Sequence, residues 1–120
     1  MIPVKICGIT SYKDAEIAVN YDASAIGMIF YQDSLRYIYP AKVKEWISAI
    51  PENVKKVGVF VNEKRKNIKT ISEKLNLDYI QLHGDESPEY CDKMIRPVIK
   101  VFHMGTDFDS AVLEDFQVHA

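Results

Sequence analysis

The chain has 120 residues, 48% of them hydrophobic and 27% charged, with a formal net charge of −2. This length is enough for one domain with a buried core, and the composition is that of an ordinary globular protein. The charge disfavours nucleic acid and acidic membranes as partners, and no apolar run approaches the roughly 20 residues of a membrane-spanning helix.

Cysteine usage indicates the compartment. The two cysteines, Cys7 and Cys91, show no paired spacing, and the N-terminus lacks the basic and apolar regions of a secretory signal peptide. This pattern favours a reducing compartment over a disulfide framework, so we expect a cytoplasmic protein.

Five short segments rich in Val, Ile, Phe and Tyr recur along the chain. They are nearly continuous rather than alternating, which is typical of parallel strands covered on both faces. We therefore predict strands at Pro3–Cys7, Ala25–Phe30, Lys56–Val61, Asp78–His83 and Val98–Phe102.

Segments with helical periodicity follow each predicted strand. Ser11 with Asp14 forms a start that resembles a capping box, and Pro40 suits the first position of a helix whose apolar stripe ends before Pro51. We expect helices beginning at Ser11, over Pro40–Ile50, after an N-cap at Asn62, over Ser87–Ile95 and over Asp109–Phe116.

Alternation of strand and helix every twenty to twenty-five residues, roughly, predicts an α/β fold of parallel βαβ units with right-handed crossovers. An open doubly wound sheet and the first part of a (β/α)8 barrel both fit this order. Residues 117–120, QVHA, resemble the entry to a sixth strand. We therefore predict that residues 1–120 form a single domain, the first five βα units of a parallel (β/α)8 TIM barrel.

The carboxyl ends of the strands are where either architecture places an active site. Period-two alternation puts Lys5 and Cys7 on one face of the first strand, and Gln81 and His83 on one face of the fourth. Cys7 is either a packed core thiol or a base or nucleophile whose pKa is lowered by positive charge. Lys5 and the helix after Gly8 are the candidate sources of that charge.

Three other polar residues lie near strand ends. Arg36, in the polar loop after the second strand, is either a solvated surface arginine or a ligand for a carboxylate or phosphate. His83 is either a hydrogen-bonded histidine or an acid–base group, and with His103 it lacks the carboxylate and spacing of a metal site. These residues predict an enzyme-like scaffold but not a reaction.

Five motifs in chain order carry a specific resemblance. They are KICGIT near the N-terminus, followed by IGMIFYQDSLRYI, VGVFVN, LDYIQLHGDES and VIKVF. With these motifs the sequence resembles phosphoribosylanthranilate isomerase, a (β/α)8-barrel enzyme family of tryptophan biosynthesis. The resemblance extends over essentially the whole chain.

The resemblance implies an aldose–ketose isomerisation, the Amadori rearrangement of N-(5-phosphoribosyl)anthranilate, a small sugar-phosphate substrate. It implies that Cys7, in the KxCG motif, is the general base and that Arg36 holds the anthranilate carboxylate. It places Gln81 and His83 at the border of the substrate. No metal or organic cofactor is implied, because acid–base catalysis and positioning suffice.

One departure from the family concerns its general acid, an aspartate at the end of the sixth strand, and its phosphate site, after the seventh and eighth strands. Neither falls within these 120 residues, so we expect them to be inactive, or nearly so, by themselves. The alternative is a non-catalytic half-barrel that acts as a binding or assembly module. Exposed strand edges would favour self-association, pairing with a complementary piece, or completion by a longer chain.

Overall fold

The five strands form one fully parallel sheet in the computed structural model, which describes residues 2–103 and 108–120. Hydrogen-bonded neighbours follow chain order, β1-β2-β3-β4-β5. A doubly wound sheet reverses its strand order at a switch point, whereas a barrel winds in one direction. The sequential order therefore confirms the barrel type of winding. The strands are β1 (Lys5–Cys7), β2 (Ala25–Ile29), β3 (Lys55–Phe60), β4 (Tyr79–Leu82) and β5 (Val98–Lys100).

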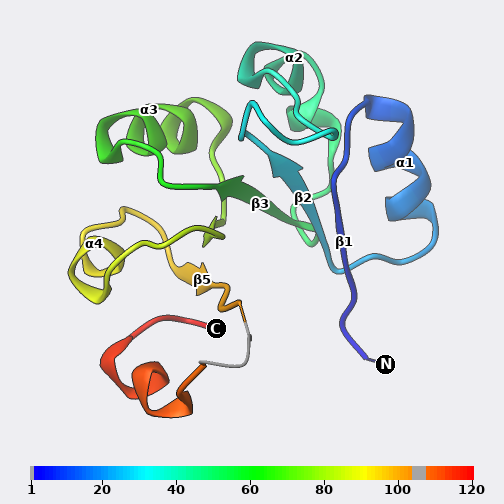
Figure 1. Cartoon of the computed structure of the whole chain (residues 1–120). Coiled ribbons are helices and arrows are strands. Elements are labelled where there is room, and N and C mark those ends of the chain that lie inside the picture. The colour runs from blue at the N-terminus through cyan, green and yellow to red at the C-terminus, as the bar shows by residue number, and fades with distance from the viewer. Residues whose placement is uncertain (1, 104–107) are drawn as a thin grey trace.

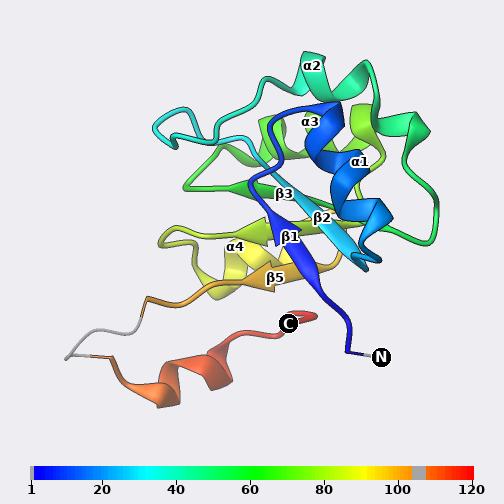
Figure 2. The same cartoon turned by 90° about the vertical axis from the view of Figure 1, so that its right-hand side faces the viewer.

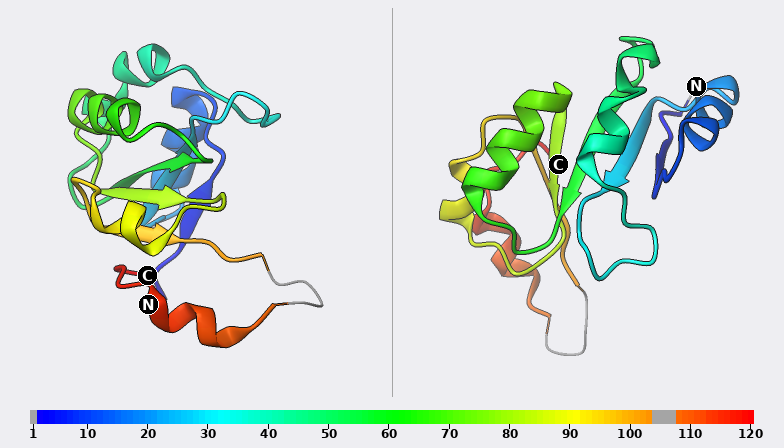
Figure 3. Two further views of the ribbon diagram at one scale, coloured as in Figure 1. Left: turned by 60° about the vertical axis from the view of Figure 1, so that its left-hand side comes forward. Right: turned by 90° about the horizontal axis from the view of Figure 1, so that it is seen from above.

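The α-helices lie together on the outer side of this sheet. In Figure 1 they follow an arc from α1 (blue) to α4 (yellow), with the strands inside it, and Figure 3 shows the same arrangement from two further sides. An outer ring of helices around a parallel sheet is the architecture of a TIM barrel, here in part. The helices are α1 (Tyr12–Asn20), α2 (Pro40–Lys44), α3 (Arg65–Leu75) and α4 (Pro88–Asp92).

The main hydrophobic core lies between the sheet and these helices. Alternate strand residues contribute to it, because successive side chains of a strand point to opposite faces. Among them are five fully buried residues, Ile26, Met28, Phe60, Ile80 and Leu82. The intervening residues face the concave side of the sheet, which is the side that a barrel encloses.

The first predicted helix begins as its sequence indicates, and the second does not extend as far as predicted. Ser11 Oγ accepts a hydrogen bond from the Asp14 backbone N–H at 3.1 Å. The helix expected over Pro40–Ile50 ends as α2 at Lys44 and is followed by a 3₁₀ turn, η1 (Ile47–Ala49). The helix breaks because Trp46 has a φ of −131°, outside the helical range.

The prediction that Asn62 caps the third helix is wrong. Helix α3 begins at Arg65 after its N-cap at Lys64, and Asn62 has a φ of +48°. Asparagine tolerates this left-handed conformation better than most residues. In it, Asn62 Oδ1 accepts a hydrogen bond from Asp85 N–H at 2.8 Å, so its side chain serves the loop after β4.

The last two predicted helices are also shorter or different. Helix α4 ends at Asp92 instead of Ile95, and the segment predicted as an α-helix over Asp109–Phe116 is a 3₁₀ helix, η2 (Ser110–Asp115). No residue of η2 is buried, so no packed apolar face favours the α-helical form. Within residues 2–103 and 108–120, no helix is long and apolar enough to cross a membrane.

The segment after η2 returns to the free edge of β5. The Ala120 carbonyl accepts a hydrogen bond from Lys100 N–H at 2.8 Å, and Ala120 N–H donates to the Val98 carbonyl at 3.2 Å. This slanted exchange is the pattern of parallel pairing. Of the predicted entry to a sixth strand over residues 117–120, His119 and Ala120 thus lie beside β5.

Candidate active site

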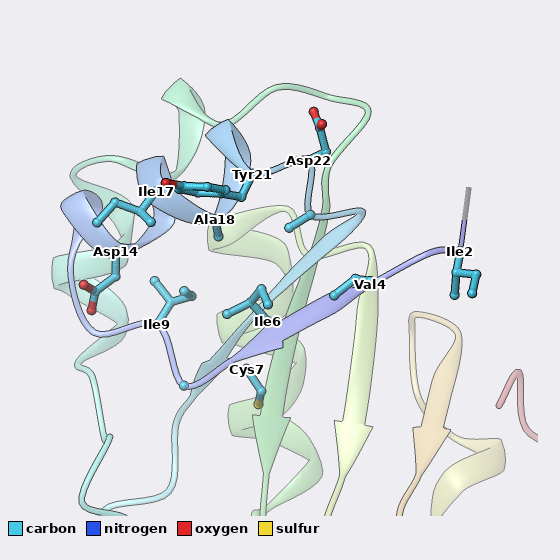
Figure 4. Close-up of a pocket in the computed structure, with 12 residues that line it drawn as sticks. Ile2, Val4, Ile6, Cys7, Ile9, Asp14, Ile17, Ala18, Tyr21 and Asp22 are labelled. Carbon is cyan, nitrogen blue, oxygen red and sulfur yellow. The ribbon is translucent and has the colours of Figure 1, made fainter.

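Strand β1 delivers Cys7 to the carboxyl edge of the sheet, with its thiol on the concave face. Cys7 is paired in register with Gly27 of β2, and a Cβ at Gly27 would lie 3.1 Å from Cys7 Sγ. The thiol therefore uses space that the missing side chain of Gly27 leaves open. Figure 4 shows the Cys7 sulfur pointing away from Ile6 and α1, so the thiol does not belong to the core under the helices.

Arg36 reaches back from the loop after β2 and lies over Gly8. Its Nη1 donates a hydrogen bond to the Cys7 carbonyl at 3.3 Å. Gly8 has a φ of +85°, and a Cβ there would lie 2.4 Å from Arg36 Nη1, so glycine is required both for the turn and for this approach. In Figure 2 the loops after β2 and β4 project from the same edge of the sheet. The structure therefore brings the predicted arginine beside the predicted cysteine.

Lys5 and Gln81 meet across the concave face. The Lys5 ammonium on β1 donates a hydrogen bond to Oε1 of Gln81 on β4, 76 positions later in the chain. Gln81 is only 7% exposed, and Lys5 is half-buried. Burial lowers the pKa of Lys5, and its attraction to the Cys7 thiolate opposes that lowering. The amide oxygen of Gln81 is thus engaged by a lysine within the protein.

His83 lies at the end of β4 against a second histidine. Its backbone N–H donates to the Phe60 carbonyl at 2.9 Å, and its ring centroid is 5.1 Å from that of His103. Burial, and then the proximity of His103, lower the pKa of His83, which favours the neutral ring. In the described part of the chain, no three His, Cys, Asp or Glu side chains gather as a metal site would require.

A buried ion pair fixes the loops around this edge. Glu86 Oε1 and Lys100 Nζ are 3.2 Å apart, with side chains 2% and 3% exposed. Glu86 also accepts hydrogen bonds from the backbone N–H groups of Asn62, at 2.8 Å, and Gly84, at 2.9 Å. Lys100 also donates to the Gly84 carbonyl at 2.7 Å. The pair ties the loops after β3 and β4 to β5, and sequence reasoning missed it.

An apolar groove of about 620 Å³ lies on the opposite side of β1, against α1 (Figure 4). Its lining includes Val4, Ile6 and Ile17 together with Ile2 and Tyr21, which are each 84% exposed. In the described sheet β1 pairs only with β2, so this groove runs along an unpaired strand edge. Cys7 is among the residues that line the groove, but its sulfur points away from it in Figure 4, so we do not assign the groove to the candidate active site.

Comparisons with known proteins indicate one family over almost the whole chain. The family model for N-(5′-phosphoribosyl)anthranilate (PRA) isomerase matches residues 4–119. A relative from Trichlorobacter lovleyi named N-(5′-phosphoribosyl)anthranilate isomerase is 45% identical over 104 residues, which are 87% of this chain and 51% of the relative. The chain spans about half the length of the curated relatives it matches.

Solved structures show the same similarity. The phosphoribosyl anthranilate isomerase of Thermotoga maritima superimposes with a TM-score of 0.81 at 42% identity, over 83% of this chain and 50% of that one. A crystal structure of the isomerase in complex with reduced 1-(o-carboxyphenylamino)-1-deoxyribulose 5-phosphate also has a TM-score of 0.81 at 42% identity. It covers 83% of this chain and 53% of the other.

Proposed function

The chain belongs to the N-(5′-phosphoribosyl)anthranilate (PRA) isomerase family, and on this premise we propose that it supplies the base and the carboxylate anchor of an isomerase of tryptophan biosynthesis. The reaction converts N-(5-phosphoribosyl)anthranilate to 1-(2-carboxyphenylamino)-1-deoxyribulose 5-phosphate. One observation carries the proposal: Arg36 Nη1 lies 3.3 Å from the carbonyl oxygen of Cys7 at the carboxyl edge of β1.

Each residue has a distinct role in this reaction. After a general acid protonates the ring oxygen and the sugar opens to a Schiff base, the Cys7 thiolate removes the proton from C2. The resulting enolamine tautomerises to the product. The Arg36 guanidinium forms a bidentate pair with the anthranilate carboxylate, and His83 and Gln81 border the substrate.

The ligand of the solved relative supports this assignment. That relative binds a reduced compound with a carboxyphenylamino group and a 5-phosphate. Arg36 is exposed at the edge where Cys7 ends β1, so its guanidinium is accessible to a carboxylate of this kind. We propose a small sugar phosphate as the ligand, and not nucleic acid or a membrane.

The location and domain organisation are part of the same proposal. Cys7 and Cys91 are both free thiols, as a reducing cytoplasm favours. The sequential parallel sheet supports residues 1–120 as a single domain, the N-terminal portion of a (β/α)8 barrel. By themselves these residues are proposed to be inactive, because the resemblance assigns the general acid and the phosphate site to later strands.

A fusion of residues 1–120 to the C-terminal half of the Thermotoga maritima relative tests the proposal. Turnover of N-(5-phosphoribosyl)anthranilate is expected from the fusion and not from residues 1–120 alone. Cys7→Ala should lower the rate of the fusion by about 10²- to 10⁴-fold, the usual contribution of a general base. Cys91→Ala, at a buried thiol of α4, is the matched control and should retain turnover. A folded fusion without turnover, or turnover that survives Cys7→Ala, would contradict the proposal.

Assembly is a second candidate function, favoured by the unpaired edge of β1. The groove beside it exposes apolar side chains that include Ile2, Ile6 and Tyr21. An unpaired strand with an apolar face is a surface for pairing with another chain. In this role the half-barrel self-associates through β1, and binding or assembly replaces catalysis.

A further inference from the structure

We propose that Lys5, held in place by Gln81, is the cation that stabilises the Cys7 thiolate. This inference rests on the proposed function, in which Cys7 acts as the general base. It assigns an electrostatic role to Lys5 and makes Gln81 a positioning residue that acts through Lys5.

The geometry of β1 places the two groups on one face. Lys5 and Cys7 are two positions apart in the strand, so both side chains point to the concave side, about 7 Å apart at their Cα atoms. A lysine side chain is flexible and fixes its charge poorly unless a partner holds it. The hydrogen bond to the buried amide of Gln81 supplies that partner and keeps the ammonium over the concave face.

The partner of Lys5 leaves its charge available. Lys100 on β5 is paired with the carboxylate of Glu86, which neutralises it. Lys5 donates to a neutral amide, and within residues 2–103 and 108–120 no carboxylate forms a salt bridge with it. A half-buried ammonium without a carboxylate favours a nearby anion, and the thiolate of Cys7 is that anion.

Other charges near Cys7 act less directly. Arg36 contacts the backbone carbonyl of Cys7, and its exposure to solvent screens its charge. The N-terminus of α1 is capped by Ser11 and carries the carboxylate of Asp14, which offsets the positive end of the helix. Burial lowers the pKa of His83, just after β4, which favours its neutral ring. Lys55 on β3 shares this face by register, but it is exposed to solvent and lies two strands away from β1. Lys5 is therefore the partly buried cation that we assign to the thiol.

The pH dependence of Cys7 alkylation by iodoacetamide tests this role, because the thiolate is the reacting species. Mass spectrometry of peptides separates the two cysteines, and Cys91, only 4% exposed, stays unreactive while the chain is folded. Lys5→Met should raise the midpoint of the Cys7 pH–rate profile by about one unit, which is about a tenfold loss of thiolate below the midpoint. Lys5→Arg should keep the midpoint near that of the parent.

A second variant separates the hydrogen bond from the charge. Gln81→Leu keeps the lysine but removes its acceptor, so a smaller rise of the midpoint is expected. If Lys5→Met exposes Cys91 to alkylation, the midpoint of Gln81→Leu is compared with that of the parent instead.

Two results would overturn the inference. One is an unchanged midpoint in Lys5→Met while Cys91 stays protected. The other is an equal rise in Lys5→Arg and Lys5→Met, which would show that packing, and not charge, sets the midpoint.

Alkylation requires no isomerase turnover. Suppose that the midpoint of Cys7 alkylation depends on Lys5 but the fusion protein shows no turnover. That result would refute only the proposed function. Turnover that depends on Cys7, without any effect of Lys5 on the midpoint, would refute only the role of Lys5.

Discussion

Two glycines decide where the candidate base and its arginine lie. Gly27 leaves room for the Cys7 thiol, and Gly8 allows both the turn after β1 and the approach of Arg36. A glycine inside an apolar strand costs conformational entropy and commonly marks a close approach. At both positions the missing side chain shapes the site as directly as any functional group.

Gly27→Ala should displace the Cys7 thiol. The added Cβ would lie 3.1 Å from Sγ, closer than most packed contacts, and such overpacking costs about 1–3 kcal/mol. We expect a lower melting temperature together with an altered rate of Cys7 alkylation. Gly58→Ala is the control, because its Cβ would lie 2.6 Å from Leu77 Cδ1 and would crowd the helix side of the sheet instead of the thiol. Gly58→Ala should lower the melting temperature without changing the rate of Cys7 alkylation. An equal change of that rate in the two variants would contradict the prediction.

His83 should make stability depend on pH in the acidic range. Burial lowers its pKa in the folded chain below the usual value of about 6.5, so the unfolded chain binds more protons between the two values. The contribution of His83 is therefore complete above about pH 6.5 and is lost as pH falls through the folded pKa. Urea unfolding between about pH 5 and 8 measures this slope. His83→Asn should reduce the slope of the free energy of unfolding against pH. If this variant keeps the slope of the parent, other groups cause the pH dependence.

At the scale of the elements, loops at the carboxyl edge are held together by the Glu86–Lys100 pair. Glu86 accepts from two backbone N–H groups as well as from Lys100, so the loops after β3 and β4 share one carboxylate. The free-energy cost of burying the Glu86 carboxylate is offset only while all of its hydrogen-bonding partners are present. The pair thereby fixes the carboxyl end of β4, where His83 lies.

Glu86→Gln should be strongly destabilising. It leaves the Lys100 ammonium buried without an anion, and breaking such a pair costs about 3–5 kcal/mol. Lys100→Met should cost less, because the Glu86 carboxylate keeps two backbone donors. Urea unfolding of both single variants and the double variant gives the coupling free energy. Glu89→Gln, at an exposed acid of α4, is the control, with an expected change within about 0.5 kcal/mol. Additive single effects would contradict the prediction.

For the whole molecule, one edge of the sheet is partly covered and the other is open. His119 and Ala120 form hydrogen bonds with β5, whereas β1 has a partner only in β2 among the described strands. The apolar groove between β1 and α1 extends this open edge. A surface of this kind favours concentration-dependent self-association.

Ile6→Lys should weaken that self-association. A lysine on the groove side of an edge strand opposes pairing with a second strand, and we expect association at least about tenfold weaker. Sedimentation over a range of protein concentrations measures this change. Leu35→Lys is the control, because Leu35 is fully exposed on the loop after β2. A parent that is monomeric at every concentration, or an equal effect of both variants, would count against assembly through β1.

Local patterns were sufficient to predict much of this fold from sequence. The five apolar runs predicted five parallel strands, and period-two alternation placed Lys5 and Cys7 on one face, as the structure confirms. The cap at Ser11 was predictable because it depends on a hydrogen bond to a residue three positions away. The break at Trp46 was not, because a continuous apolar stripe gives no sign of where tertiary packing ends a helix.

The sequence itself therefore determined the order of the strands and the cysteine at the end of β1. It also determined the family to which the chain belongs. Only the tertiary structure decided that Asn62 serves the loop after β4 instead of capping α3, and that Gln81 holds Lys5. It also decided that Arg36 lies over Gly8. The physical reason is distance along the chain. Capping and periodicity act within a few residues, whereas these contacts join residues 23 to 76 positions apart and depend on how the strands align when the sheet curves.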